Sequence, residues 1–290
     1  MADTAARGGR WILTLDNDLA AAIAAQKPAA LDTWTKIGRA TGFFAAHTAW
    51  ANYLPEAVIG VISDFSGANE FLSRELLNLL DRTNEQYRII AKAKASAERF
   101  RGLRAVIYPD AEPPSPELRR QVLAFVDAGG LLITGPKWGP PPGTRRPLGP
   151  KTDDHPRYVS RTLGKGRVAV SKAELDEPYL LANDSVILVS HRCDLLRFWN
   201  GGAVGSYYTV APDRKRAAVQ ILLYAERGGN LQRGGQGDAI SVLVAGRYRT
   251  ARMWTLDQPT ARAVEMVPQN GGVELHLPTV SEYVSVELEV

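Results

Sequence analysis

The sequence predicts an open α/β sheet of parallel strands with helices on both faces, followed by a small antiparallel β-sandwich. Two observations lead to this fold class. Between Ala57 and Thr134, apolar runs of strand length alternate with amphipathic helix patterns, which is the order of a parallel sheet with crossover helices. From Tyr207 onward, short strand patterns are separated by turn residues, which is typical of an antiparallel sandwich.

Four strands are expected in the α/β part. A run that is apolar on both faces suits a parallel strand buried between two layers of helices, and Ala57–Ser63 is such a run. A hairpin around Leu163-Gly164-Lys165 is expected at the edge of the same sheet. The expected strands are Ala57–Ser63, Tyr87–Ile90, Leu103–Tyr108 and Leu131–Thr134, with Arg157–Ser160 and Gly166–Val170 in the hairpin.

Two helices are expected between these strands. The first spans about Glu70–Asp81 and carries leucines on one face. The second begins with Ser115 as N-cap and Pro116 as first helical residue. It ends at Gly129-Gly130, where a left-handed C-cap is needed.

The chain is expected to divide into residues 1–55, 56–205 and 206–290. The first segment carries a wide apolar face on its long helix, which therefore has much surface to cover. Residues 1–10 are expected to be unstructured, Trp11–Leu15 to form a strand, and Leu19–Ala25 and Leu31–Tyr53 to form helices.

The last part of the chain is expected to contain mainly strands. Asp194–Trp199 is expected to be helical and capped by Asn200-Gly201-Gly202, and Ser185–Val189 to start a helix or form a short strand. Alternation in the final strand places Val284, Val286, Leu288 and Val290 inward and Ser285, Glu287 and Glu289 outward. The expected strands are Tyr207–Val210 and Ala217–Tyr224, then, after the glycine-rich Gly228–Gly237, Ala239–Val244, Arg249–Trp254, Arg262–Val267, Val273–Leu277 and Tyr283–Val290.

Composition excludes several classes of protein. The chain has 290 residues, 45% hydrophobic and 23% charged, and no stretch has the apolar length of a membrane span. A net charge of +4 with scattered Arg and Lys argues against a nucleic-acid partner. The single Cys193 excludes an internal disulfide and a cysteine-based zinc site. Without an apolar signal core, the chain as written is expected to be cytoplasmic, or secreted if an upstream signal is missing.

Ligands of open α/β sheets bind beyond the carboxyl ends of the strands. Polar residues at these ends form an acidic rim with one amine and one indole, which would suit a carbohydrate or another polyol. The alternative is structural, because acidic residues at strand ends also cap the following helices. The candidate ligand-binding residues are Asp64, Ser66, Asn69, Glu70, Asp110, Glu112, Lys137 and Trp138.

Other chemistries lack support in the sequence. The turn after the first strand has one glycine and two acids, so it does not resemble a phosphate cradle. No nucleophile elbow is present, and the four histidines form no metal-binding pair, so no cofactor and no metal are expected. Asp110 and Glu112 could serve as paired glycosidase carboxylates, although acids near a helix entrance are ordinary.

The order of parts resembles the C-terminal half of beta-galactosidase-like glycoside hydrolases of family 42 type. The residues that carry the likeness are Val58–Asp64, Ala105–Asp110, Phe125–Ile133 and Glu274–Pro278 followed by Tyr283. In that family a catalytic (β/α)8 barrel precedes a flavodoxin-like, glutamine-amidotransferase-like trimerisation domain and a small β-sandwich. The resemblance implies that Trp11–Tyr53 is the tail of the barrel.

The resemblance leaves catalysis open, because no position matches the catalytic glutamates of the barrel. It implies a non-catalytic region that packs in a homo-oligomer or against a partner barrel and could contact carbohydrate. The expected sign is an exposed apolar face on the Leu31–Tyr53 helix. The alternatives are a free-standing hydrolase, or a small-molecule-binding protein, with its site at the sheet's carboxyl edge. Such an enzyme would use Asp64, Glu70, Asp110, Glu112 or His191.

Overall fold

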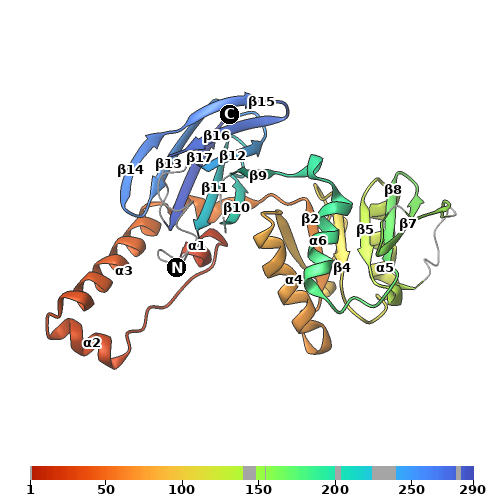
Figure 1. Cartoon of the computed structure of the whole chain (residues 1–290), viewed down its shortest axis with the longest axis horizontal. Coiled ribbons are helices and arrows are strands. Elements are labelled where there is room, and N and C mark those ends of the chain that lie inside the picture. Colours follow the sequence, from red (N-terminus) through yellow and green to blue (C-terminus); the bar gives the residue numbers. More distant parts are fainter. Residues whose placement is uncertain (1, 140–147, 154, 200–203, 224–239, 279–281) are drawn as a thin grey trace. The chain divides into compact units, whose positions relative to one another are not determined.

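The computed structural model describes residues 2–139, 148–153, 155–199, 204–223, 240–278 and 282–290, and the chain forms two compact units (Figure 1). One unit is Glu56–Leu196. The other joins Met1–Pro55 to Arg197–Val290. The fold is mixed α/β, with one mixed sheet and two antiparallel sheets. The predicted cap at Asn200–Gly202 and the glycine-rich Gly228–Gly237 lie outside the described residues.

The unit Glu56–Leu196, called the α/β unit below, contains a seven-stranded sheet in the order β3-β2-β4-β5-β8-β7-β6. The first five strands in this order are parallel, and β7 and β6 extend the sheet with antiparallel pairing. The four predicted strands and the predicted edge hairpin are confirmed. The bounds are β2 Ile59–Ser63, β3 Tyr87–Ala91, β4 Ala105–Tyr108, β5 Leu131–Thr134, β6 Lys151–Thr152, β7 Tyr158–Leu163 and β8 Gly166–Ser171.

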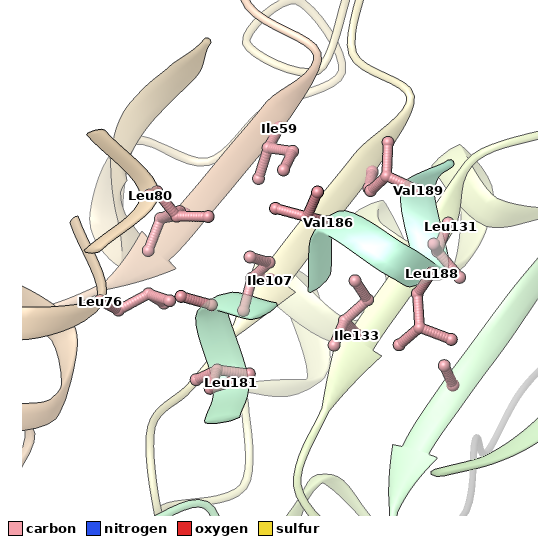
Figure 2. Packing of buried hydrophobic residues seen from close by; sticks show 14 of the residues in the cluster. Ile59, Leu76, Leu80, Ile107, Leu131, Ile133, Leu181, Val186, Leu188 and Val189 are labelled. Atoms are coloured by element: carbon pink, nitrogen blue, oxygen red, sulfur yellow. The ribbon is translucent and has the colours of Figure 1, made fainter. Parts of the chain in front are cut away.

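Helices α4 (Glu70–Arg82) and α6 (Pro178–Val189) cover one face of this sheet, and α5 (Pro116–Asp127) covers the other. Figure 2 shows alternate strand residues such as Ile59 and Ile107 packed against Leu76 and Leu181. The intervening residues face α5, as Leu132 does. Both faces are therefore buried, which explains why the strands read as continuous apolar runs. Ser185–Val189 is helical and not a strand, but it ends α6 and does not start a helix.

The two predicted ends of α5 are confirmed. The Ser115 side chain accepts a hydrogen bond from the Leu118 N–H at 3.2 Å, and Pro116 is the first helical residue. Gly129 has φ +126°, a conformation that a residue with Cβ rarely adopts.

The N-terminal segment differs from its prediction. Residues Ala2–Ala6 form helix α1, whereas Trp11–Leu15 form no strand and pair with no strand among the described residues. Asp16 ends no strand; it caps the next helix by accepting a hydrogen bond from the Leu19 N–H at 2.7 Å. The predicted long helix is shorter. The elements are α2 (Asn17–Ala24), α3 (Pro28–Ala46) and η1 (Thr48–Asn52).

Two antiparallel sheets form the rest of the unit that joins Met1–Pro55 to Arg197–Val290. Their orders are β1-β10-β11-β17-β13-β14 and β15-β16-β12-β9. The predicted strands of this region are confirmed, with one exception given below. The bounds are β1 Leu54–Pro55, β9 Leu196–Trp199, β10 Val204–Val210, β11 Arg216–Leu223, β12 Ile240–Ala245, β13 Thr250–Thr255, β14 Gln258–Ala263, β15 Glu265–Gln269, β16 Gly272–Leu277 and β17 Tyr283–Glu289.

Two predictions in this region are wrong. Asp194–Trp199 is not helical, because Leu196–Trp199 pairs beside β12 as an edge strand, and tertiary pairing overrides local propensity. Arg262–Val267 is not one strand. The chain changes sheets at Val264, whose N–H donates to the Ala251 carbonyl oxygen at 3.0 Å.

The alternation of β17 is also only partly right. Val284, Val286 and Leu288 are buried, but Val290 is exposed and Ser285 is buried. Aromatic residues of α3 and η1, including Phe43, pack on the Tyr283 face of the sheet and remove it from water. Within the described residues, no helix is long and apolar enough to cross a membrane.

Candidate functional site

Polar residues meet at the carboxyl edge of the α/β unit. Asp64 follows β2, Lys92 follows β3, and Asp110 and Glu112 follow β4. The strand order reverses between β2 and β4, since one chain connection leads from β2 to β3 and the next crosses back to β4. Such a switch point is where open α/β sheets bind ligands. With Asn69 these residues form what is called the carboxylate–lysine cluster below.

The Lys92 ammonium lies at the centre of the cluster. Its Nζ is 3.0 Å from Asp64 Oδ2 and 3.7 Å from Glu112 Oε2, and it forms an ion pair with Asp110 Oδ2. Burial alone would lower the pKa of Lys92, but the hydrogen bonds from its amine to Asp110 and Asp64 outweigh burial and raise that pKa. Lys92 is therefore charged at every physiological pH.

Asp110 is the buried member of the cluster, with a side chain that is 0% exposed. The Ser63 hydroxyl donates to its Oδ1 at 2.5 Å, and the Asp64 N–H donates to its Oδ2 at 3.3 Å. Burial raises the pKa of Asp110, and the hydrogen bonds from Lys92 and Ser63 offset this only in part. Both carboxylate oxygens of Asp110 accept hydrogen bonds from protein donors, so Asp110 holds its neighbours in place and is not open to a ligand.

Asn69 connects the two exposed carboxylates. Its Nδ2 donates to Glu112 Oε2 at 2.8 Å and to Asp64 at 3.3 Å, and its Oδ1 accepts from the Ala111 N–H at 3.2 Å. The hydrogen bond from Asn69 lowers the pKa of Glu112. Burial acts to raise the pKa of Asp64, but hydrogen bonds from Lys92 and neighbouring groups lower it below its usual value. Asp64 and Glu112 are therefore the two carboxylates of the cluster whose side chains are exposed to solvent.

The cluster also contains the ligand types of a metal site. Oxygens of Asp64, Asp110 and Glu112 lie within 4.8 Å of one another. Carboxylates so close repel each other unless a cation lies between them. In this chain the Lys92 ammonium lies among the three carboxylates and offsets part of their negative charge.

The other predicted rim residues lie elsewhere. Glu70 forms a helical ion pair with Arg74 at 2.7 Å, and Lys137 pairs with Glu174 at 3.4 Å. Trp138 is 1% exposed, so its indole offers no open face on which a sugar ring could stack. It packs edge-to-face on Tyr108 with ring centroids 5.1 Å apart.

Two further sequence candidates are also placed by the structure. The Ser66 N–H donates to Asp64 Oδ1 at 3.2 Å and so shapes the turn after β2. His191 lies beside Glu85 and Asp194. Glu85 precedes β3, so His191 is at the amino ends of the strands and cannot act with Asp110 or Glu112.

Sequence reasoning missed Lys92, the residue on which the cluster depends. The rule that named Asp64 and Asp110, polar residues directly after a strand, also names Lys92, which follows the second predicted strand, Tyr87–Ile90. What the sequence does not show is that a lysine from the edge strand reaches over β2 to the end of β4.

The fold is similar to that of solved glycoside hydrolases. Alpha-L-fucosidase isoenzyme 2 from Paenibacillus thiaminolyticus matches with a TM-score of 0.64 and 15% identity, over 99% of this chain and 56% of that chain. A catalytic mutant of Gan42B, a GH42 beta-galactosidase from G. stearothermophilus, matches with a TM-score of 0.56 and 14% identity, over 91% of this chain and 44% of that chain. A beta-galactosidase from Bacillus circulans sp. alkalophilus matches with a TM-score of 0.52 and 13% identity, over 83% of this chain and 42% of that chain.

This chain therefore spans about half the length of the structures that it matches. The expected resemblance to part of a family 42 type beta-galactosidase is confirmed at the level of the fold. No family model matches the sequence, and no curated protein matches it.

Proposed function

We propose that this chain is the non-catalytic C-terminal region of a glycoside hydrolase-like protein and that it acts in oligomer assembly. The observation that carries the proposal is the exposed apolar surface of the N-terminal segment. Ile12 is 91% exposed, and Leu13, Leu15 and Trp34 are exposed as well. Single exposed apolar residues are ordinary, but three within four consecutive positions of an unpaired extended segment are typical of an interface.

The architecture supports the same proposal. The five parallel strands, numbered along the chain, have the spatial order 2-1-3-4-5, which is the flavodoxin-like order. We assign the α/β unit, Glu56–Leu196, to the amidotransferase-like trimerisation domain, and the antiparallel sheets of residues 197–290 to the small β-sandwich of such enzymes. Residues 1–55 then contribute the surface that a catalytic barrel or a second copy would cover.

The cluster's geometry favours a non-catalytic role. A glycosidase acid must reach the glycosidic oxygen, and its partner must face the sugar ring or a water. Asp110 meets neither condition, because its side chain is fully buried and both its oxygens accept hydrogen bonds from the protein. Glu112 is exposed, but its lowered pKa makes it a poor proton donor near neutral pH.

Light scattering coupled to size-exclusion chromatography tests the assembly role. We expect the full chain to form a stable dimer or trimer that dissociates when Ile12→Ser and Leu13→Ser are combined. Val290→Ser is the control, since Val290 is also an exposed apolar side chain and lies outside both the N-terminal segment and the α/β unit. A monomer at all concentrations that hydrolyses any glycoside would overturn the proposal.

A second candidate function is carbohydrate binding at the carboxylate–lysine cluster. Asp64 and Glu112 present exposed oxygens at the switch point, and carboxylates accept hydrogen bonds from sugar hydroxyls. Isothermal titration of the chain with a panel of oligosaccharides tests it. Glu112→Gln should weaken a genuine interaction, whereas Glu174→Gln, outside the cluster, should not. Cleavage of the sugar in the same titration would favour the free-standing hydrolase instead.

A further inference from the structure

A pocket of about 240 Å³ lies in the α/β unit, on the sheet face that α5 covers. Its wall includes Leu123 of α5 and three valines, Val159 of β7 and Val168 and Val170 of β8. These valines share one side because strand side chains alternate between the two faces. β7 and β6 extend the sheet beyond β8, and the pocket lies against β7 and β8 on this face.

The charged residues at the pocket are all of one sign. Lys151 and Arg161 line it, and none of the described lining residues is acidic. Within the described residues neither cation forms an ion pair. An anion bound between them would therefore gain charge-assisted hydrogen bonds without displacing an existing partner.

Trp138 forms part of the wall of this pocket. Its side chain lines the pocket, is 1% exposed, and carries an indole N–H that has no acceptor among the described residues. A buried donor without an acceptor costs about 1–3 kcal/mol. The indole nitrogen is itself closed off from solvent, so its N–H does not contact a ligand directly, but its NMR resonance reports changes in the pocket wall around it.

We propose that this pocket binds a small carboxylate with an apolar body, such as an aryl or medium-chain alkyl carboxylate. The apolar body would pack against Leu123 and the valines, and the carboxylate would bind Lys151 and Arg161. The volume is just below the usual range of roughly 300–1,000 Å³ for ligand pockets, so it suits a ligand of few atoms. A sugar does not fit this chemistry, because apolar walls would leave its hydroxyls without partners.

Phenylacetate is the probe, and 2-phenylethanol is its neutral counterpart of the same shape. The indole N–H resonance of Trp138, assigned by its loss in Trp138→Phe, is followed by NMR during a titration of the full chain. We expect a saturable shift with phenylacetate and at least tenfold weaker binding of 2-phenylethanol. Arg161→Met should weaken phenylacetate binding at least tenfold, whereas Lys165→Met, a nearby basic residue outside the pocket, should leave it unchanged.

Three results would overturn the proposal. One is the absence of a saturable Trp138 shift up to tens of millimolar phenylacetate. Another is equal affinity for the acid and the alcohol, a comparison made on the unaltered chain, so it does not depend on whether Arg161→Met folds. The last is equal weakening by Arg161→Met and Lys165→Met, which would mean that only the overall charge matters.

Discussion

Replacing Lys92 by Met is the sharpest test of the carboxylate–lysine cluster. The substitution keeps most of the side-chain volume and removes the charge that faces three carboxylates. Asp110, whose side chain is 0% exposed, is then left ionised without its ammonium. Removing one partner of a buried ion pair costs about 3–5 kcal/mol. Because Asp110 keeps two other donors and Lys92 is 23% exposed, we expect the lower end, about 3 kcal/mol.

The assay is hydrogen exchange of peptides that contain β2 and β4, measured across a urea titration. A loss of about 3 kcal/mol corresponds to a more than 100-fold rise in the opening equilibrium constant, since 1.4 kcal/mol is tenfold. Lys137→Met is the matched control. Lys137 pairs with Glu174 at 3.4 Å on the surface, where such a pair contributes about 0–1 kcal/mol.

The double variant Lys92→Met/Asp110→Asn separates charge from packing. If the loss arises from an uncompensated buried carboxylate, the neutral amide at position 110 should recover most of it. The reasoning is refuted if Lys92→Met costs no more than Lys137→Met, or if the double variant is less stable than Lys92→Met alone.

Three further predictions concern an aromatic contact, two glycines and the titration of two carboxylates. Phe43→Ala should detach the N-terminal helices from their sheet, at a cost of about 3–5 kcal/mol, and limited proteolysis should cleave them faster. Gly166→Ala should destabilise the α/β unit by about 1–3 kcal/mol in urea, because the new Cβ would overlap two backbone carbonyl oxygens. By contrast, Gly42→Ala should stabilise α3 by about 1 kcal/mol, because open space surrounds the position of the new Cβ. The pKa values of Asp64 and Glu112 are lowered in the folded chain, so their contribution to stability is present above the ordinary carboxyl pKa and is lost as pH falls through the lowered values. The urea midpoint should therefore decline below about pH 4. An unchanged midpoint down to about pH 2.5 would contradict this.

The strands of the α/β unit could be predicted because their local signals agree with their tertiary environment. Ile59–Ser63 and Leu131–Thr134 are buried on both faces, so nearly every residue in them must be apolar, and the run is visible without knowledge of its neighbours. The same agreement holds at Ser115, where the cap residue acts on its own backbone.

The failed predictions concern segments whose state depends on a distant partner. Leu196–Trp199 is a strand only because β12 accepts it at the sheet edge, whereas Trp11–Leu15, equally apolar, has no strand beside it and stays unpaired. The alternation pattern predicts that Ser285 points outward to solvent, but α3 and η1 cover its face of the sheet and bury it. Local composition holds no record of such contacts between remote segments.

For the candidate site, the sequence by itself determined which residues end the strands: Asp64, Asp110 and Glu112 were found from position alone, because strand ends in a parallel sheet share one edge. Only the tertiary structure decided what these residues do. It places the Lys92 amine among the three carboxylates, buries Trp138 and places His191 at the opposite end of the strands. The physical reason is that charge pairing and burial depend on distances between chain segments far apart in sequence, which packing sets and residue order does not.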